Sequence, residues 1–262
     1  MMSTFKFKWP RRMACITAET TEMVYALGAG DRVVGVSGYS VRPAEAREKP
    51  KVAAFTSVRM DKIRELKPDL ILGFSDLQKD IARELVAEGY PVFISNQRSL
   101  EEVEDMILAT GRLIGCAEAG EKLQQSFSEE LQRLADSCRS SLRPKVYFEE
   151  WDQPLISGIR WVSELIEKFG GVDVFADKSL NKTAKHRVVR PEEVIAANPD
   201  ILIASWCGKK VQFEKIRTRE GWNQIRAVQN NRLYEIKSSD ILAPGLSLLH
   251  GARRLAEIFE KF

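Results

Sequence analysis

Residues that commonly bind metal ions are scarce in this sequence. Only two histidines, His186 and His250, occur in 262 residues, and neither has a second ligand-type side chain three or four positions away. The four cysteines are far apart and form no CxxC pair; they are Cys15, Cys116, Cys138 and Cys207. This pattern predicts no metal site, and free thiols are typical of a reducing compartment. A metal site that joins Cys207, His186 and a glutamate across loops stays open as an alternative.

Long apolar runs and a strong charge imbalance are also missing. No run of eighteen apolar residues occurs, which excludes a transmembrane helix. The formal charge of +3 is nearly balanced for this length, so nucleic acid is not an expected partner. Residues 1–16 contain basic side chains but neither an apolar core nor a small-residue cleavage site, unlike a secretory signal. The sequence as it stands therefore predicts a cytoplasmic protein, or a periplasmic or lipoprotein-anchored one if a leader was removed.

Motifs for phosphate binding and catalysis are absent as well. In LGAGDRVVGVSG, residues 27–38, the glycines end a helix and precede a strand, whereas a dinucleotide loop follows a strand and opens a helix. A helix C-cap is the better interpretation. No GxSxG nucleophile motif occurs. Glu149, Glu150 and Asp152 could form a glycosidase-like carboxylate pair, but adjacent residues on an extended segment point to opposite faces. We expect no enzyme; a hydrolase or lyase with Glu149 or Glu150 as its base is the alternative.

What the sequence does contain is a regular alternation of strand and helix patterns. Its 44% hydrophobic and 29% charged residues are typical of a soluble globular protein. Strands are predicted at residues 14–18, 32–37, 69–75 and 91–95, and again at 145–150, 171–177, 200–205 and 232–237. Segments with apolar residues at helical spacing separate them and end in Gly or Pro. The alternation predicts α/β architecture with parallel sheets.

Residues 99–141, between the two sets of strands, carry no strand pattern. Ser99 and Glu102 are spaced as a capping box, and residues 117–140 could form one helix of about 35 Å at 1.5 Å per residue. We therefore predict an N-terminal lobe at residues 1–98, a connecting helical segment at 99–141 and a C-terminal lobe at 142–262. The predicted fold is two Rossmann-like lobes joined by a single long, rigid α-helix, with a ligand cleft between the lobes.

The two halves also resemble each other. MDKIRELKPDLILG (60–73) aligns without a gap with PEEVIAANPDILIA (191–204), so Asp61 falls opposite Glu192. A second similarity pairs TEMVYALGAG (21–30) with SELIEKFGG (163–171), which places Glu22 opposite Glu164. The repeat indicates two lobes of similar construction.

Aromatic and polar residues follow the predicted strands in both halves. Flat rings supply contact area to an organic ligand and a few polar groups fix its orientation. The segment FEEWDQPLISGIRW (148–161) is the richest example, because it places two tryptophans after the first strand of the second half. The predicted ligand-binding residues are Tyr39, Phe55, Asp76, Gln78, Arg98, Glu149, Trp151, Arg160, Trp161, Trp206, Lys209 and Asp240, with Gln97 and Leu242 beside them. Some of the rings belong to lobe cores in the competing interpretation.

These stretches resemble a known family. RMACITAETTEMVYALGAGDRVVGVSGYS (12–40), PEEVIAANPDILI and GWNQIRAVQNNRLYEI are similar to segments of the helical-backbone, or class III, periplasmic binding proteins. The resemblance spans essentially the whole chain and is greatest for the cobalamin-binding proteins of ABC importers, with iron–siderophore and haem binders as relatives. WDQPLISGIRWVSELIE and SWCGKK further resemble a branch of the family without a signal sequence.

The resemblance implies a function and specific contacts. It implies a monomeric solute-binding protein that captures a cobalamin-like or other metal-chelate ligand, with no covalently bound cofactor, for ABC-type import. Tyr39 and Phe55 match aromatic ligand contacts of the family, and Asp61 and Glu192 match carboxylates that dock on the permease, although Asp61 is shorter than the usual Glu. Ala18 and Glu19 depart from the usual Pro-Ser. A cytosolic carrier or sensor of the same fold that docks a protein partner is the alternative.

Overall fold

The computed structural model describes residues 9–138 and 142–262, which form two compact units. Unit 1 comprises Met1–Gln97 and Glu101–Ser126, and unit 2 comprises Arg98–Leu100 and Phe127–Phe262. Part of the segment interpreted as lacking a signal sequence, residues 1–8, lies outside the described residues. So do the last residues of the predicted 99–141 connecting segment.

Unit 1 is built on a mostly parallel sheet. Its six strands are β1 (Met13–Cys15), β2 (Val33–Ser37), β3 (Lys51–Ala54), β4 (Ser57–Val58), β5 (Leu70–Phe74) and β6 (Val92–Ser95). Their order in the described part of the unit is β4-β3-β2-β1-β5-β6, and only the β3–β4 pair is antiparallel. Strands β2 to β4 are added on one side of β1, and β5 and β6 are added on its other side. The neighbouring strands β1 and β5 therefore mark the topological switch point of the sheet.

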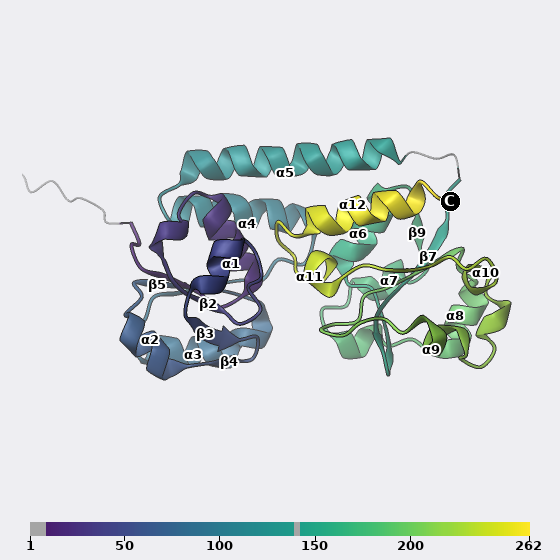
Figure 1. Ribbon diagram of the computed structural model, residues 1–262, viewed down its shortest axis with the longest axis horizontal. Helices are drawn as coiled ribbons and strands as arrows, with labels where there is room; N and C mark the ends of the chain where they lie inside the picture. The colour runs from purple at the N-terminus through teal and green to yellow at the C-terminus, as the bar shows by residue number, and fades with distance from the viewer. Residues whose placement is uncertain (1–8, 139–141) are drawn as a thin grey trace, which may run out of the picture. The chain divides into compact units, whose positions relative to one another are not determined.

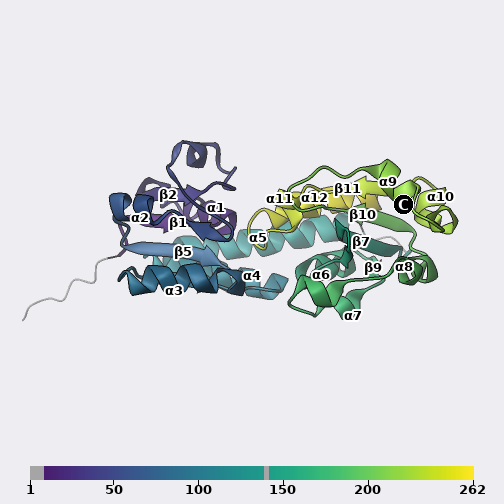
Figure 2. The same cartoon turned by 90° about the horizontal axis from the view of Figure 1, so that it is seen from below.

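Helices cover both faces of this sheet. They are α1 (Ala18–Ala26), α2 (Met60–Leu66), α3 (Lys79–Ala87), α4 (Leu100–Leu113) and the first part of α5 (Ala117–Ser137). Helices α2 and α3 lie on one side of the strands and α1 lies on the other (Figure 1; Figure 2). Ile63 of α2 and Leu85 of α3 pack with Ile71 in a fully buried apolar cluster, and burial of this kind stabilises the layered arrangement.

The residues predicted as one long helix form α5, which ends at Ser137 in the described chain. Between Leu100 and Ser137 the chain is helical except for a break between α4 and α5, where Gly115 takes φ +76°. Within unit 1 the two helices come into backbone contact at Gly111 and Gly120: a Cβ on Gly111 would lie 3.0 Å from the Gly120 Cα. Small residues at this crossing are therefore a packing requirement.

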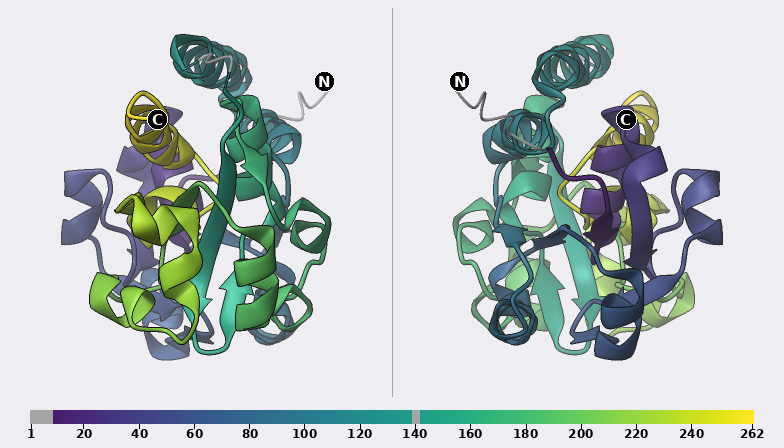
Figure 3. Two further views of the ribbon diagram at one scale, coloured as in Figure 1. Left: turned by 90° about the vertical axis from the view of Figure 1, so that its right-hand side faces the viewer. Right: turned by 90° about the vertical axis from the view of Figure 1, so that its left-hand side faces the viewer.

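Unit 2 repeats the arrangement of a sheet between helices. Its strands are β7 (Lys145–Asp152), β8 (Leu155–Ser157), β9 (Val172–Asp173), β10 (Ile201–Ala204) and β11 (Leu233–Glu235). The order is β11-β10-β7-β8, β9 also pairs with β7, and β8 alone is antiparallel to its neighbour in the described part. Figure 3 shows the long strand β7 in the middle of this unit with helices on both sides.

Most helices that follow β7 in unit 2 are short, and α6 and α12 are the longer ones. In chain order, the helices are α6 (Arg160–Lys168), α7 (Ala176–Ser179), α8 (Pro191–Ala197), α9 (Phe213–Arg217), α10 (Arg226–Gln229), α11 (Ser238–Ile241) and α12 (Leu248–Phe259). One apolar cluster contains Tyr147, Leu202 and Trp222, and Tyr147 meets the Trp222 ring edge-on, with centroids 6.2 Å apart. The α/β class with two lobes, predicted from the alternation, is confirmed.

The internal repeat is visible in the backbone. Helix α2 leads into β5, and helix α8 leads into β10, as the gap-free alignment implies. Each helix ends at a residue in the left-handed region, Lys67 with φ 46° and Asn198 with φ 45°. This conformation turns the chain out of the helix so that the Pro-Asp pair can enter the strand.

The aspartates of this repeat have the same structural task. Asp69 accepts the backbone N–H of Arg12 at 2.9 Å, just before β1, and Asp200 accepts that of Lys145 at 2.8 Å, at the start of β7. Each carboxylate thus satisfies a backbone donor at the beginning of a central strand. The sequence repeat is a repeat of local hydrogen bonding as well as of fold.

Several predicted strand boundaries were wrong. The strand predicted at 14–18 is Met13–Cys15, and Ala18 already begins α1. The strand predicted at 145–150 continues to Asp152 and turns back at once as β8, so part of the expected loop is a hairpin. The strand predicted at 171–177 is only Val172–Asp173, because Asp173 Oδ1 accepts the Phe175 N–H at 3.0 Å and turns the chain into α7. Strands β3 and β4 were not predicted; both are short, and β4 is the edge strand of the sheet with β3 beside it.

Candidate functional site

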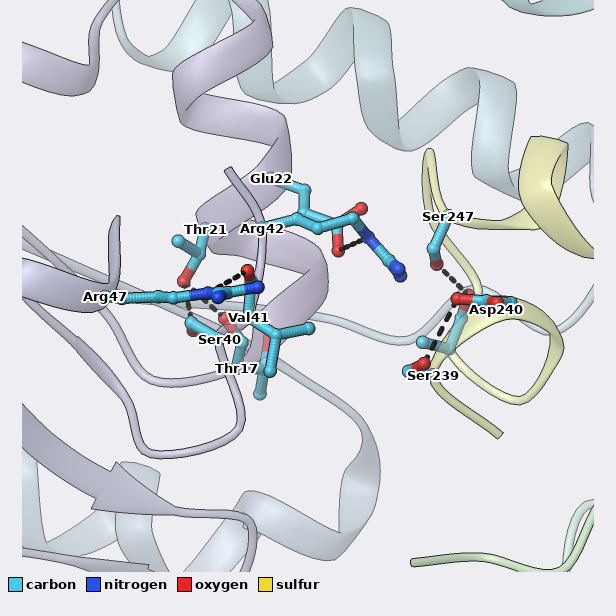
Figure 4. A network of polar contacts seen from close by, with 11 residues as sticks. Thr17, Thr21, Glu22, Ser40, Val41, Arg42, Arg47, Ser239, Asp240 and Ser247 are labelled. Atoms are coloured by element: carbon cyan, nitrogen blue, oxygen red, sulfur yellow. Dashed lines mark hydrogen bonds and ion pairs between the residues drawn. The ribbon is translucent and has the colours of Figure 1, made fainter. Parts of the chain in front are cut away.

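The loops after β1 and β2 of unit 1 are joined by short hydroxyl contacts. Thr17 caps helix α1, with its side chain accepting the Thr20 N–H, and the Thr20 hydroxyl donates to the Leu72 carbonyl of β5 at 3.2 Å. Thr21 and Ser40 share a hydrogen bond of 2.7 Å between their hydroxyls (Figure 4). These buried contacts fix the two loops against the switch-point strands.

Charged contacts hold the loop after β2 in place. Arg42 forms an ion pair with Glu22 of α1 at 3.0 Å, and Arg47 Nε donates to the Val41 carbonyl at 2.8 Å (Figure 4). Within this frame the Tyr39 side chain stays 64% exposed. The ring is therefore presented to solvent by a loop whose backbone is well fixed.

Tyr39 is one of three exposed apolar residues at the carboxyl-end edge of the unit 1 sheet. Val41 lies on the same loop after β2 and Leu77 follows β5; they are 40% and 62% exposed. We call Tyr39, Val41 and Leu77 the apolar edge. Exposed large apolar side chains in loops at the carboxyl-end edge of an α/β sheet are typical of a site for a largely apolar ligand.

Other predicted unit 1 residues support this edge. Gln78 is fully buried: its Nε2 donates to the Phe55 carbonyl at 2.9 Å and its Oε1 accepts the Phe74 N–H at 3.2 Å. Gln78 thus joins two strand-end loops, and its burial removes it from the set that a ligand could contact. Phe55 is half-buried and Asp76 is exposed, with the Asp76 N–H donated to Asn96.

Glu19, which replaces the usual serine in the turn after β1, is buried at the start of α1 with 7% exposure. Burial raises the pKa of this carboxyl above its usual value of 4.5, against the hydrogen bonds from its own N–H and from Thr17. A buried acid at this position adds a titratable group to the carboxyl-end edge of unit 1.

Replacing Glu19 with glutamine should change how stability depends on pH. In the wild type the folded state holds the proton to higher pH than the unfolded chain, so stability falls as pH rises from 4.5 through the raised pKa. Glutamine cannot lose a proton, and the Glu19→Gln profile should be flatter over this window. Thermal unfolding followed by circular dichroism at several pH values measures the difference; superimposable profiles would contradict the burial argument.

In unit 2 the first glutamate of FEEWDQPLISGIRW belongs to a buried ion pair. Glu149 is 0% exposed, and both of its oxygens accept from the Arg219 guanidinium, at 2.6 and 2.9 Å. Trp206 is 1% exposed and donates its indole N–H to Glu149 Oε1 at 2.9 Å. Arg219 in turn lies 4.3 Å from the Trp222 ring. Glu149 and Trp206 are thus core residues of unit 2, and we do not retain them as ligand contacts.

The other two carboxylates of this segment also have cations of their own. Glu150 accepts from Arg187 at 2.6 and 3.1 Å, and Arg187 is itself 2% exposed. Asp152 pairs with Lys209 at 2.5 Å. Glu149 and Glu150 have different partners, as strand alternation predicts. Because all three carboxylates are neutralised within unit 2, none is placed as a free acid or base.

Trp151 and Lys209 lie together at the carboxyl-end edge of the unit 2 sheet. The Lys209 ammonium is 4.0 Å from the centre of the Trp151 ring, and the Trp151 indole donates to the Gln153 carbonyl at 2.9 Å. Trp151 is half-buried and Lys209 is exposed. The pair places an exposed cation beside an aromatic ring, and a role of the two residues as ligand contacts stays a prediction.

The remaining unit 2 residues differ in accessibility. Trp161 is 2% exposed and donates its indole N–H to the Ile241 carbonyl at 2.9 Å, so it holds α6 to α11 and does not line a surface. Arg160 pairs with Glu164 at 2.8 Å. Asp240 accepts from Ser239 at 3.1 Å (Figure 4). Arg98 and Leu242 are half-buried, and Gln97 is buried.

Sequence reasoning missed Arg187 and Arg219, the partners of the two glutamates. Both lie in segments without a recognisable motif, 37 and 70 residues from their partners. The one available signal was that buried carboxylates require cations. Val41 and Leu77 were also missed, because exposure cannot be read from an apolar residue in a loop.

Asp61 and Glu192 occupy equivalent places in the two units. Each lies in the first turn of its helix, α2 and α8 respectively, and each is exposed. Asp61 pairs with Arg59 at 3.2 Å. Helix N-termini favour acidic side chains, so this placement alone is also compatible with a local structural role.

Among the described residues, no group of three or more His, Cys, Asp or Glu side chains is arranged to hold a metal ion. His186 is exposed, with its Nδ1 3.2 Å from the Thr183 hydroxyl, and Cys207 is exposed in the loop after β10. No helix in the described part of the chain is long and apolar enough to cross a membrane.

The family is decided by a match to the sequence model described as periplasmic binding protein, which covers residues 13–239. The chain belongs to the periplasmic binding protein family. This binding protein is 27% identical over 253 residues to the vitamin B12-binding protein of Vibrio parahaemolyticus, covering 95% of this chain and 89% of that protein. The substrate-binding role and the class III resemblance are thereby confirmed.

Two further similarities agree with this assignment. The binding protein is 26% identical over 266 residues to an uncharacterized ABC transporter substrate-binding lipoprotein of Bacillus subtilis, covering 95% of this chain and 80% of that protein. The crystal structure of the periplasmic vitamin B12 binding protein of Vibrio cholerae superimposes with a TM-score of 0.76 at 26% identity, covering 96% and 97% of the two chains.

Proposed function

We propose that this chain is the substrate-binding protein of an ABC importer and that its ligand is a corrinoid, either cobalamin or a close relative. The observation that carries the ligand class is the apolar edge of unit 1. Tyr39 at 64% and Leu77 at 62% exposure leave a large apolar surface at the place where α/β sheets bind ligands. A corrin ring offers a broad flat surface that matches such residues.

The carboxyl-end edge of unit 2 supports the same ligand class. Trp151 adds a second aromatic surface, and Lys209 beside it can donate to amide or phosphate oxygens at the periphery of a corrinoid. Similarity to vitamin B12-binding proteins along 95% of the chain favours this ligand over other metal chelates. Phe55 and Arg160 are further proposed contacts.

We further infer that the protein binds its ligand without chemical conversion. The three carboxylates from Glu149 to Asp152, the strongest candidates for acid or base, each form an ion pair within unit 2. A group that holds a cation in this way is poorly placed to move protons on a ligand.

The ligand proposal is tested by isolating the protein from its source and recording its absorbance spectrum and native mass. A corrin spectrum with a mass increase equal to one corrinoid is the expected result. A haem spectrum, or a bound mass that matches no corrinoid, would contradict the proposed ligand while leaving the binding role intact.

Asp61 and Glu192 are the proposed contacts to the importer. Their equivalent, exposed positions on the two units suit a permease surface that presents one cation to each unit. Asp61 forms an ion pair with Arg59 at 3.2 Å, and this pair would have to break for Asp61 to bind a cation of the permease.

Charge reversal of both carboxylates separates docking from ligand binding. The Asp61→Lys/Glu192→Lys variant should bind cyanocobalamin as the wild type does, because neither residue belongs to a strand-end loop. It should no longer stimulate ATP hydrolysis by the importer in membrane vesicles of the source organism. Glu65→Lys/Glu214→Lys, which reverses two other exposed carboxylates on α2 and α9, is the matched control and should stimulate hydrolysis as the wild type does. Full stimulation by the Asp61/Glu192 variant would refute the docking role.

A further inference from the structure

Unit 2 contains a cavity beside β11, the strand at the edge of its sheet. The cavity has a volume of about 630 Å³ and is lined by the loop after β10, by the first residue of α9, by β11 with the residues that follow it, and by α12. Small-molecule sites commonly have volumes of about 300–1,000 Å³, so the cavity is large enough for an organic ligand. All of its walls belong to unit 2.

The lining of this cavity is strongly basic. Its lining contains four cationic side chains and a single carboxylate. The cations are Lys209, Lys210, Lys237 and Arg254, and the carboxylate is Glu235. Glu235 Oε1 accepts the Val211 N–H at 3.0 Å, which directs one of its oxygens to the backbone. The excess of positive charge in a concave site attracts anions.

Two of these cations are already paired and two are not. Lys209 pairs with Asp152, and Arg254 pairs with Glu257 at 2.6 Å on the same helix. Within residues 9–138 and 142–262, the Lys210 and Lys237 ammonium groups form no hydrogen bond or ion pair. Two ammonium groups at one cavity can therefore meet a ligand without first giving up a partner.

Aromatic side chains supply the apolar part of the lining. Phe213 begins α9 and Tyr234 is the middle residue of β11, and both are half-buried. The Arg217 guanidinium lies 6.0 Å from the Phe213 ring. Aromatic faces next to free ammonium groups match a ligand that has a flat ring at one end and several negative charges at the other.

We propose that this cavity binds a small organic polyanion with a flat ring, the chemistry of a nucleoside diphosphate. The lysines meet the phosphate oxygens, and Phe213 or Tyr234 contacts the ring. This site is separate from the proposed corrinoid contacts except for Lys209, which lies at the border of both, so Lys210 and Lys237 are the residues that distinguish it.

The proposal is tested by calorimetric titration of the full chain with ADP, and with adenosine and pyrophosphate as separated halves of the ligand. ADP should bind saturably and more weakly as salt increases, and each half should bind more weakly than ADP. Lys210→Met/Lys237→Met should lower the affinity for ADP by at least about tenfold, because hydrogen bonds to charged groups are strong.

A matched variant controls for net charge. Lys182→Met/Lys185→Met removes the same two charges from exposed positions outside the cavity lining and should leave ADP affinity within about twofold of the wild type. Tyr234→Leu should weaken ADP but not pyrophosphate. No saturable ADP binding, or equal losses in the two lysine variants, would overturn the proposal. The titration is independent of cyanocobalamin, so failure of the corrinoid proposal does not affect it.

Discussion

Replacement of Arg219 by methionine is expected to lower the free energy of unfolding of unit 2 by about 3–5 kcal/mol. The variant keeps most of the side-chain volume but removes the one charged partner that Glu149, which is 0% exposed, has among the described residues. A buried carboxylate without its cation retains the cost of leaving water and loses the attraction that offset it. The Trp206 indole alone cannot replace two guanidinium hydrogen bonds.

Urea unfolding followed by tryptophan fluorescence measures this loss. Four of the five tryptophans, Trp151, Trp161, Trp206 and Trp222, lie in unit 2, so the signal reports mainly on that unit. Arg217→Met is the matched control: its pair with Glu214 is at the surface, and its removal should change stability by less than about 1 kcal/mol.

A second substitution identifies the cause of the loss. Glu149→Gln in the Arg219→Met background removes the unpaired charge and should restore much of the lost stability. If Arg219→Met and Arg217→Met are equally stable, the buried ion pair does not have the structural role assigned to it.

Truncation of Tyr39 or Trp151, the aromatic residues at the two strand-end edges, should have the largest effect on ligand binding. Tyr39→Ala and Trp151→Ala are each expected to weaken corrinoid binding by about 1–4 kcal/mol, as loss of an aromatic anchor does. Tyr39 is 64% exposed and has little to lose in stability, so its effect should appear in affinity alone. Equilibrium titration with cyanocobalamin measures both variants.

Two comparison variants make this prediction specific. Val86→Ala removes an equally exposed apolar side chain from α3 of unit 1, away from the strand ends, and should not change affinity. Trp161→Ala should mainly destabilise unit 2, because that ring is buried and bonded to Ile241. Unchanged affinity in both Tyr39→Ala and Trp151→Ala would remove the proposed site.

The parts of the fold that sequence predicted correctly are those with local causes. The repeat of MDKIRELKPDLILG in PEEVIAANPDILIA predicted two helix–strand units, and each indeed ends its helix in the left-handed region before a Pro-Asp pair. The glycines at 27–38 were correctly interpreted as a helix cap: Gly28 takes φ +75° directly after α1. Hydrophobic periodicity and turn chemistry act over a few residues, and so they can be read from a short window.

The parts that sequence could not provide depend on distant partners. FEEWDQPLISGIRW contains two tryptophans and three carboxylates. Only the folded structure reveals that Trp161 is buried whereas Trp151 is half-buried. Glu149 becomes a core residue because Arg219 reaches it from 70 residues away. The same segment folds as a hairpin, which strand patterning alone did not indicate, since β8 has only three residues.

The central claim is that this chain binds a corrinoid, and calorimetric titration of the ligand-free protein with cyanocobalamin tests it most directly. We expect one ligand per chain with a dissociation constant on the order of 1 μM or tighter, equivalent to about −8 kcal/mol. Tyr39→Ala should lower the affinity in the same experiment. No saturable binding of cyanocobalamin, or tight binding of haemin in its place, would contradict the account.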